Sequence, residues 1–114
     1  MASTFKNAGM SVVTTDDANA NLYTASGVTA VIHALYISNK SSTNTAEVDV
    51  KVTTDGGSTF YYVGKGLFID VNNTLILDKP INLETNDILR VVGNLNVDSS
   101  APDLETYASI LEIS

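Results

Sequence analysis

The chain contains neither cysteine nor tryptophan, and it has only two prolines and six basic residues among its 114. Without cysteine it forms no disulfide and has no thiolate to act as nucleophile or metal ligand. The six basic residues are outnumbered by thirteen acidic ones, and the resulting net charge of −7 opposes binding to nucleic acid or to an anionic membrane. We therefore expect neither of these partners.

Long hydrophobic runs are also missing. The longest, residues 28–37, contains Thr29 and His33, so it is too short and too polar to span a bilayer. The first residues, MASTFK, lack the apolar stretch of a secretion signal. We expect a chain made in the cytoplasm, with a length that suits one domain and one hydrophobic core.

The clearest pattern in the sequence is a strand pair, residues 45–53 and 58–63, joined by a turn that contains Asp55-Gly56-Gly57. In the first strand, alanine and valine alternate with charged and polar residues. Successive side chains of a strand point to opposite faces, so one face is apolar and the other polar. An apolar sheet face needs a second layer to cover it, and the pattern therefore predicts a β-sandwich or a barrel.

Similar strand patterns recur along the chain, separated by turn-forming residues at short intervals. We expect an all-β fold with about seven to nine short strands in one antiparallel sandwich, either Ig-like or a jelly roll, over residues 11–114. Residues 1–10, in which Phe5 and Met10 are isolated apolar residues, are expected to form an N-terminal arm. The other expected strands are residues 11–15, 22–25, 28–39, 67–71, 74–77, 88–93 and 104–113.

Two expected strands carry apolar residues on both faces. In residues 28–39, Ile32 and Tyr36 lie on the face opposite Leu35, and in residues 104–113 Ile110 lies opposite Tyr107. A second apolar face needs cover from the arm or from another subunit. We therefore predict a homo-oligomeric interface. Its predicted residues are Phe5, Met10, Ile32, Tyr36, Tyr61 and Ile110.

Candidate catalytic and metal-binding residues form no recognisable motif, and we predict no catalytic, metal or cofactor site. His33, the only histidine, has no orienting carboxylate at a readable spacing, so we interpret it as a core or interface residue. A small hydrolase that uses His33 is the alternative. The aspartates lack the alternating spacing of a calcium loop and are typical of turns. Gly64-Lys65-Gly66 lacks the spacing of a phosphate loop and predicts a strand break or bulge.

The tyrosines favour a further alternative. Rings exposed on a β-sandwich can stack on sugars, and residues 60–62 place Tyr61 on the face opposite its two aromatic neighbours. A carbohydrate-binding module for host attachment would use Tyr61 or Tyr23. Tyrosine equally suits protein interfaces, so both interpretations remain open.

A series of segments, taken in order, carries a resemblance to a known group of proteins. The segments are Val31–Asn39, Ala46–Val52, Gly57–Tyr62, Thr74–Leu77, Leu83–Leu89 and Tyr107–Ile113. Their order resembles that of small structural proteins of tailed bacteriophages, over residues 11–114, in hydrophobicity and turns and not in chemical motifs. The resemblance implies a virion protein that decorates or cements the capsid. Its partners would be copies of itself, for example in a trimer, and the major capsid protein. A neck or tail component is the alternative that the resemblance implies.

Overall fold

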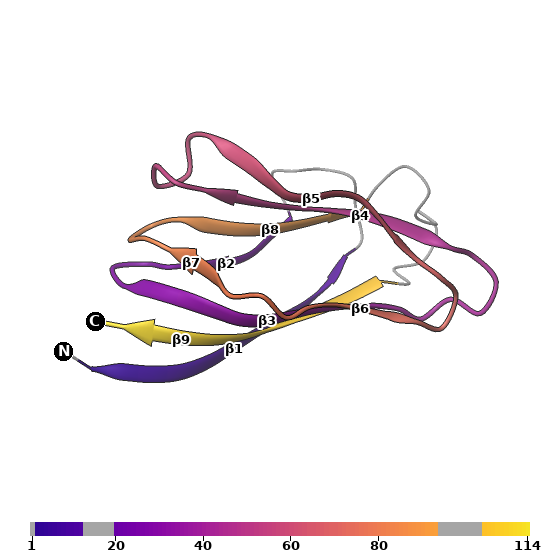
Figure 1. Cartoon of the computed structure of the whole chain (residues 1–114), viewed down its shortest axis with the longest axis horizontal. Helices are drawn as coiled ribbons and strands as arrows, with labels where there is room; N and C mark the ends of the chain where they lie inside the picture. The colour runs from indigo at the N-terminus through magenta and orange to yellow at the C-terminus, as the bar shows by residue number, and fades with distance from the viewer. Residues whose placement is uncertain (1, 13–19, 94–103) are drawn as a thin grey trace.

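The structure is a computed structural model, and it describes residues 2–12, 20–93 and 104–114. These residues form two antiparallel sheets that pack face to face, with β1, β9 and β3 in the lower layer of Figure 1 and β4, β5 and β8 in the upper layer. Among them no helix is long and apolar enough to cross a membrane. The strands are β1 (Ser3–Val12), β2 (Asn21–Thr24), β3 (Thr29–Asn39), β4 (Ala46–Thr53), β5 (Phe60–Ile69), β6 (Thr74–Leu77), β7 (Ile81–Leu83), β8 (Ile88–Gly93) and β9 (Leu104–Ile113). The predicted all-β sandwich is confirmed.

The order of the strands identifies the kind of sandwich. The first sheet has the order β1-β9-β3-β6, with β7 also paired to β3, and the second has the order β2-β8-β4-β5. Because β6 and β7 pair with successive parts of β3, they act as one interrupted strand. The chain then crosses repeatedly between two four-stranded sheets, which is the arrangement of a jelly roll.

The core lies between the two sheets and follows the alternation of β4. Val48 and Val50 are fully buried, whereas Glu47 and Asp49 lie on the outer face, as predicted. Each buried valine stabilises the fold because its burial removes apolar surface from water. The buried apolar cluster consists of Val12, Ala25, Ala30, Ile32, Leu35, Ile37, Ala46, Val48, Val50, Ile69, Leu83, Leu89, Val91, Leu104, Ala108 and Ile110.

The segments expected as separate strands at 58–63 and 67–71 are one strand, β5, with an irregular middle. Its register with β4 shifts twice, between Val48 and Val50 and between Val50 and Lys51. Gly66 has a φ of 63°, which only glycine adopts without steric cost, and its N–H donates to Asp49 Oδ1 at 2.7 Å. The bulge predicted at Gly64-Lys65-Gly66 is confirmed. The short β7 was not among the predicted strands.

A β-bulge in β3 overturns the predicted placement of Ile32 and Ile110. The register with β9 shifts between Ile32 and Ala34, so His33 is an additional residue in β3. Before the bulge the even-numbered residues of β3, such as Ile32, therefore face the core, and after it the odd-numbered residues, such as Leu35, do. Ile32 and Ile110 are both fully buried between the sheets. The prediction that they lie on an outer face and need cover from another subunit is wrong.

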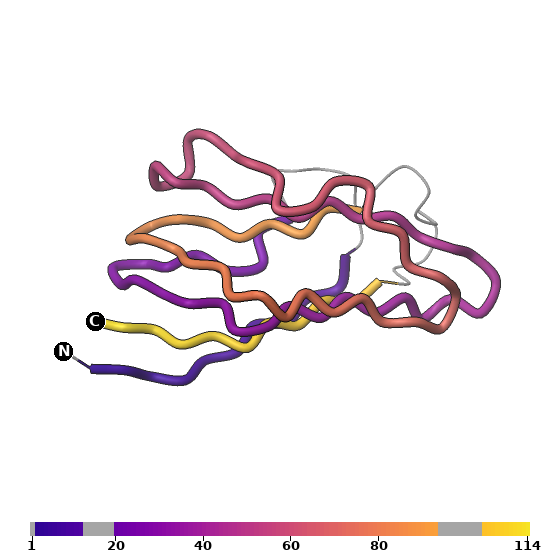
Figure 2. The backbone as a smooth tube through the Cα atoms, in the orientation of Figure 1, coloured from indigo at the N-terminus to yellow at the C-terminus, as the bar shows by residue number. Residues whose placement is uncertain are grey.

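Most of the expected N-terminal arm belongs to the first sheet. Residues Ser3–Val12 form β1 and pair with β9 without any shift of register. Ala2 and Ser114 exchange backbone hydrogen bonds of 3.0 and 2.9 Å, so the two ends of the described chain lie side by side (Figure 2). The sheet begins at Ser3, and the predicted boundary between an arm and the sandwich at residue 11 is wrong. Residues 3–7 are exposed on both faces, which is why no apolar periodicity marked them as a strand.

Candidate functional site

Exposed apolar side chains gather on the edge strands of the two sheets. β1 and β6 end the order of the first sheet, and β2 and β5 end the order of the second. Among the described residues, every exposed large apolar side chain except Tyr107 belongs to β1, β5 or β6. They are Phe5, Tyr61, Tyr62, Val63, Phe68 and Ile76. Sheet edges with exposed apolar groups are sites where another chain can bind.

The backbone of β1 offers a continuous row of outward-pointing groups. Ala2 and Ser114 exchange both of their backbone hydrogen bonds, and such pairs alternate with non-bonded pairs along an antiparallel ladder. Because the register with β9 has no shift, the even-numbered residues of β1 bond to β9 and the N–H and C=O groups of the odd-numbered residues point away from it. The outward-pointing residues are Ser3, Phe5, Asn7, Gly9 and Ser11.

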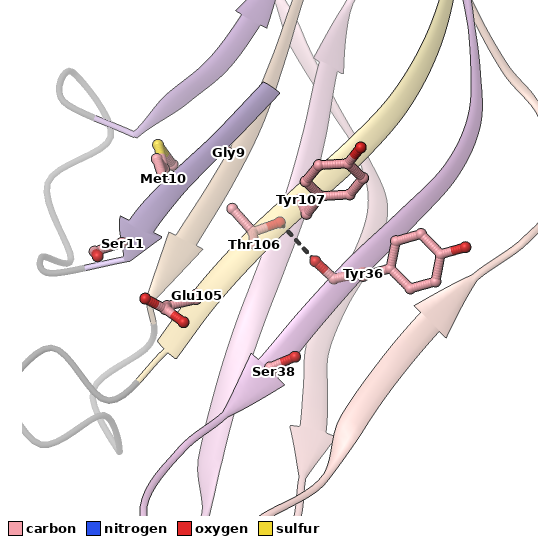
Figure 3. A pocket seen from close by; sticks show the side chains of 8 residues that line it. All are labelled: Gly9, Met10, Ser11, Tyr36, Ser38, Glu105, Thr106 and Tyr107. Carbon is pink, nitrogen blue, oxygen red and sulfur yellow. Dashed lines mark hydrogen bonds between the residues drawn. The ribbon is translucent and has the colours of Figure 1, made fainter. Parts of the chain in front are cut away.

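A shallow hollow of about 410 Å³ lies on the outer face of the first sheet beside this edge (Figure 3). Tyr107 and Tyr36, on the neighbouring strands β9 and β3, have ring centroids 6.2 Å apart and ring planes inclined by 47°. Gly9 lies opposite Tyr107 in the register, and a Cβ at Gly9 would lie 3.9 Å from the Tyr107 ring. The absence of a side chain at Gly9 therefore leaves an open place beside that ring. The other lining residues are Met10, Ser11, Ser38, Glu105 and Thr106.

The β5 edge has a different chemistry. The Nζ atoms of Lys51 and Lys65 lie 5.0 and 4.8 Å from the centre of the Tyr62 ring, and the Arg90 guanidinium lies 3.8 Å from the centre of the Phe60 ring. Cations at these distances are attracted to the electron-rich ring faces. Three of the six basic residues of an acidic chain therefore lie on β5 or beside it.

A polar cluster joins the two sheets near β1. Glu112 of β9 accepts a hydrogen bond from the hydroxyl of Tyr23 in β2, and Lys6 Nζ lies 3.8 Å from Glu112 Oε1. Burial raises the pKa of Tyr23 above its ordinary value, and the hydrogen bond to Glu112 and the charge of that carboxylate raise it further. The Tyr23 ring is half-buried in this cluster, which makes Tyr23 a poor platform for a sugar.

A second polar cluster ties the loops that flank β5. The carboxylate of Asp87, which is only 3% exposed, accepts hydrogen bonds from Thr53 Oγ1 at 3.3 Å, Gly56 N at 3.0 Å and Glu84 N at 2.9 Å. Ile88 N in turn donates to Thr53 Oγ1 at 2.9 Å. No buried side-chain nitrogen or oxygen among the described residues lacks a hydrogen-bond partner, and these bonds hold the loop between β4 and β5 against the turn between β7 and β8.

The six residues predicted for the interface do not form one surface. Phe5 lies on the β1 edge of the first sheet, Tyr61 lies on the β5 edge of the second sheet with 56% of its surface exposed, and Tyr36 lies in the hollow on the outer face of the first sheet. Met10 is half-buried against the core, which Ile32 and Ile110 belong to. Their role in an interface stays a prediction for the exposed members of the set.

Sequence reasoning did not single out Gly9, Phe68 or Tyr107 as site residues. Tyr107 is 47% exposed, although the sequence placed Ile110 and not Tyr107 on the outer face. The buried residues of β9 are Leu104, Thr106, Ala108 and Ile110, and Tyr107 lies between two of them on the opposite, outer face. The sequence could not indicate a role for Gly9, because its contact with the Tyr107 ring depends on which residue lies opposite it in the sheet.

His33 was predicted to be a core or interface residue, and the structure contradicts the core position, while the interface position stays a prediction. It is exposed at the bulge of β3, and it has no hydrogen-bond or ion-pair partner among the residues that the structure describes. Within the same ranges no group of three or more histidine, aspartate or glutamate residues is arranged to hold a metal ion. The hydrolase alternative thus gains no supporting contact at its proposed base.

No protein-family model matches this chain, and no curated protein matches it either. The fold and surface define a β-sandwich of jelly-roll connectivity whose exposed apolar groups lie along its edges. These edges and the hollow beside β1 are the candidate binding surfaces.

Proposed function

We propose that this protein is a structural component of a bacteriophage virion and that it decorates and cements the capsid. The observation that supports this most is the position of the exposed apolar side chains on β1, β5 and β6. A protein that joins neighbours in a lattice needs contact surfaces on more than one side, and this sandwich has them at both edges. The jelly roll also occurs in viral capsid and lectin domains, which is support by analogy of fold alone.

The proposed mechanism is attachment through many small contacts. Each edge offers a few apolar side chains, which is too little surface for a strong single contact. A capsid presents the same site many times, and copies that contact both the major capsid protein and each other gain affinity by multivalency. The net charge of −7 keeps free copies apart and soluble until short-range contacts form. A neck or tail position would use the same edges.

Carbohydrate binding for host attachment is the second candidate, and the hollow beside β1 favours it. Tyr36 and Tyr107 lie there beside the carboxylate of Glu105 and the hydroxyl of Ser38. Rings next to hydrogen-bonding groups are a common arrangement in small-ligand sites. Tyr61 is a separate exposed ring. A glycan-array signal that Tyr107→Ala removes, and Tyr61→Ala retains, would favour the hollow as a sugar site; the opposite result would favour Tyr61.

The proposed virion role is tested on the particle. Virions of the phage that encodes the chain, labelled with an antibody against it and viewed by electron microscopy, should carry the label over the head. Label on the neck or tail would support the alternative position, and purified virions without any label would overturn the proposal.

Variants then test the surface. Phe68→Ser combined with Ile76→Ser, both at exposed positions, should weaken binding to heads that lack the protein by about tenfold or more without affecting folding. The matched control is Asp78→Ser combined with Thr74→Ser, which changes exposed polar residues near β6 and should bind normally.

A further inference from the structure

We infer that β1 pairs with β1 of a second copy of this chain, antiparallel and centred on Asn7, so that two copies share one continuous sheet. The inference names a surface and a register that the proposed virion role does not require. It rests on the geometry of β1 and stands whether or not the protein belongs to a virion.

The backbone of β1 favours one register above the others. Its outward-pointing residues are the odd-numbered ones from Ser3 to Ser11, with Asn7 at their centre. An antiparallel strand centred on Asn7 places Asn7 opposite Asn7, Phe5 opposite Gly9 and Ser3 opposite Ser11 of the second copy. Every outward N–H and C=O of both strands then has a partner, whereas a shifted register leaves some of them unpaired. The contact is the same from both copies, as a two-fold interface requires.

The side chains support the same register. Phe5 is 83% exposed, the highest value among the large apolar residues described, and it lies on the outer face of the sheet like Gly9. Residues directly opposite each other in an antiparallel pair share a face. Phe5 of one copy would therefore cover Gly9 of the second copy and lie beside the Tyr107 ring that flanks this glycine. An aromatic side chain across from a strand glycine covers the gap that the glycine leaves.

Two otherwise unrelated features are thereby explained together. The hollow beside Gly9 is open because the ring that fills it comes from the second copy, and Phe5 is exposed because its binding place is not in its own chain. Ile76, Tyr36 and Tyr107 of the second copy lie in a row across its sheet. In the joined sheet, Phe5 of the first copy continues this row across the contact between the two β1 strands. This row buries apolar groups that a single copy leaves in water.

The charges on β1 do not oppose this pairing. Lys6 is the one charged residue in the strand, and the register places it opposite Ala8 of the second copy, away from the other Lys6. Lys6 also has Glu112 within its own chain at 3.8 Å. An inward-pointing charge on an edge strand usually protects against pairing, but here a carboxylate balances it. The central Asn7 side chains face one another and can exchange amide hydrogen bonds.

Single cysteines test the register, because the chain has none of its own. Asn7→Cys should form a disulfide-linked dimer on mild oxidation, since hydrogen-bonded opposite residues have Cα atoms about 5.5 Å apart, within the reach of a disulfide. Phe5→Cys alone should not, because the two copies of residue 5 would be about 14 Å apart along the strands. Phe5→Cys combined with Gly9→Cys should cross-link again. Failure of Asn7→Cys to cross-link, or equal cross-linking by Phe5→Cys alone, would overturn the inference.

Proline substitutions test the backbone contact in solution by analytical ultracentrifugation. Asn7→Pro removes an outward N–H only, so the chain should keep its fold and its β9 pairing while dimer affinity falls at least about tenfold. Ala8→Pro removes a hydrogen bond to β9 and should lower the thermal midpoint instead. Phe5→Ser should weaken the dimer by about tenfold with an unchanged fold. A wild-type chain that stays monomeric, or a dimer that Asn7→Pro leaves intact, contradicts the inference. A dimer that is absent from virions would leave it standing and remove the proposed function.

Discussion

β1 and β5 are both ten residues long and lie at opposite edges of the sandwich, but another strand can continue only one of them. β1 pairs with its neighbour in one uninterrupted register, so its outward groups form a regular row. β5 shifts register twice and passes through Gly66 in a left-handed conformation, which breaks the row. Bulges and charges are common means of protecting an edge from unwanted pairing, and β5 has both.

The edge whose backbone is less open to pairing, β5, has more exposed apolar side chains than β1. β5 carries four exposed large apolar residues and a lysine at its bulge, whereas β1 exposes only Phe5 among its large apolar residues, since Met10 is half-buried and Val12 is buried. An edge rich in apolar side chains would aggregate if its backbone were also open, so β5 can bind partners through side chains only. β1 has few side chains with which to bind, and its backbone supplies the contact. If β1 pairs with a second copy as inferred, the β5 edge is left for a different partner.

Loss of the Asp87 carboxylate should have the largest effect, and it should fall on the β5 side. Asp87→Ala leaves the donors of Thr53, Gly56 and Glu84 without their acceptor, which we expect to lower the free energy of unfolding by about 2–3 kcal/mol. Urea denaturation measures the change in the free energy of unfolding of the whole chain. Hydrogen exchange should show faster opening of β4 and β5, with β1 and β9 much less affected.

The control for this variant is Asp78→Ala, at an exposed aspartate outside the loop cluster, which should change stability by less than about 0.5 kcal/mol. If Asp87→Ala loosened β1 as much as β5, the two edges would open as one cooperative unit and would not be independent of each other.

A glycine-to-alanine pair should show a smaller effect that differs between the edges. Gly66 has a φ of 63°, so alanine there should cost about 1 kcal/mol of stability. Gly9 has no such φ, and a Cβ there would meet the Thr106 carbonyl oxygen at 3.5 Å, an ordinary contact. Gly9→Ala should therefore leave the stability unchanged or raise it by about 0.5 kcal/mol. Thermal denaturation of both variants in dilute solution decides between these outcomes, and an equal loss at both sites would mean that β1 is as strained as β5.

The sequence predicted the fold where each face of a strand meets one environment. From Ala46 to Val50, β4 alternates as its sequence pattern indicates, because one face packs on the core and the other meets solvent, whereas the polar Thr53 at its end is buried beside Asp87. β3 and β9 could not be oriented in this way. One additional residue at His33 exchanges the faces of β3, and no residue type marks a bulge of this kind. In β9 the larger Tyr107 lies outside and the smaller Ala108 inside, against the order of size.

The edge contacts could be predicted only in part, because they depend on register. Phe5 stood out as an apolar residue among polar ones, but its strand has no apolar periodicity and forms through pairing with β9. That pairing joins residues from the two ends of the chain, which no local pattern can indicate. Gly9 and Tyr107 become neighbours only once this register is known. Propensity alone therefore could not have located the hollow.

The pH dependence of stability should show the smallest effects, of opposite sign at the two edges. Near β1, the raised pKa of Tyr23 means that the unfolded chain loses this proton first as the pH rises above 10.0, so the free energy of unfolding falls there. Near β5, hydrogen bonds from the backbone N–H of Thr59 and then of Ser58 hold the pKa of Asp55 below 3.8. The stabilisation from Asp55 is therefore complete above that value and is lost as the pH falls through the lower, folded-state pKa.

Two conservative variants separate the alkaline limb of the pH–stability curve, where the stability falls at high pH, from its acid limb, where it falls at low pH. Tyr23→Phe should reduce the alkaline decline and leave the acid limb unchanged, because phenylalanine has no proton to lose. Asp55→Asn should reduce the acid decline and leave the alkaline limb unchanged, because the amide does not titrate in this range. Urea denaturation across the pH range measures both, with far-ultraviolet circular dichroism as the probe of folding. A Tyr23→Phe curve parallel to that of the wild type at high pH would mean that the contact between Tyr23 and Glu112 does not join the sheets beside β1.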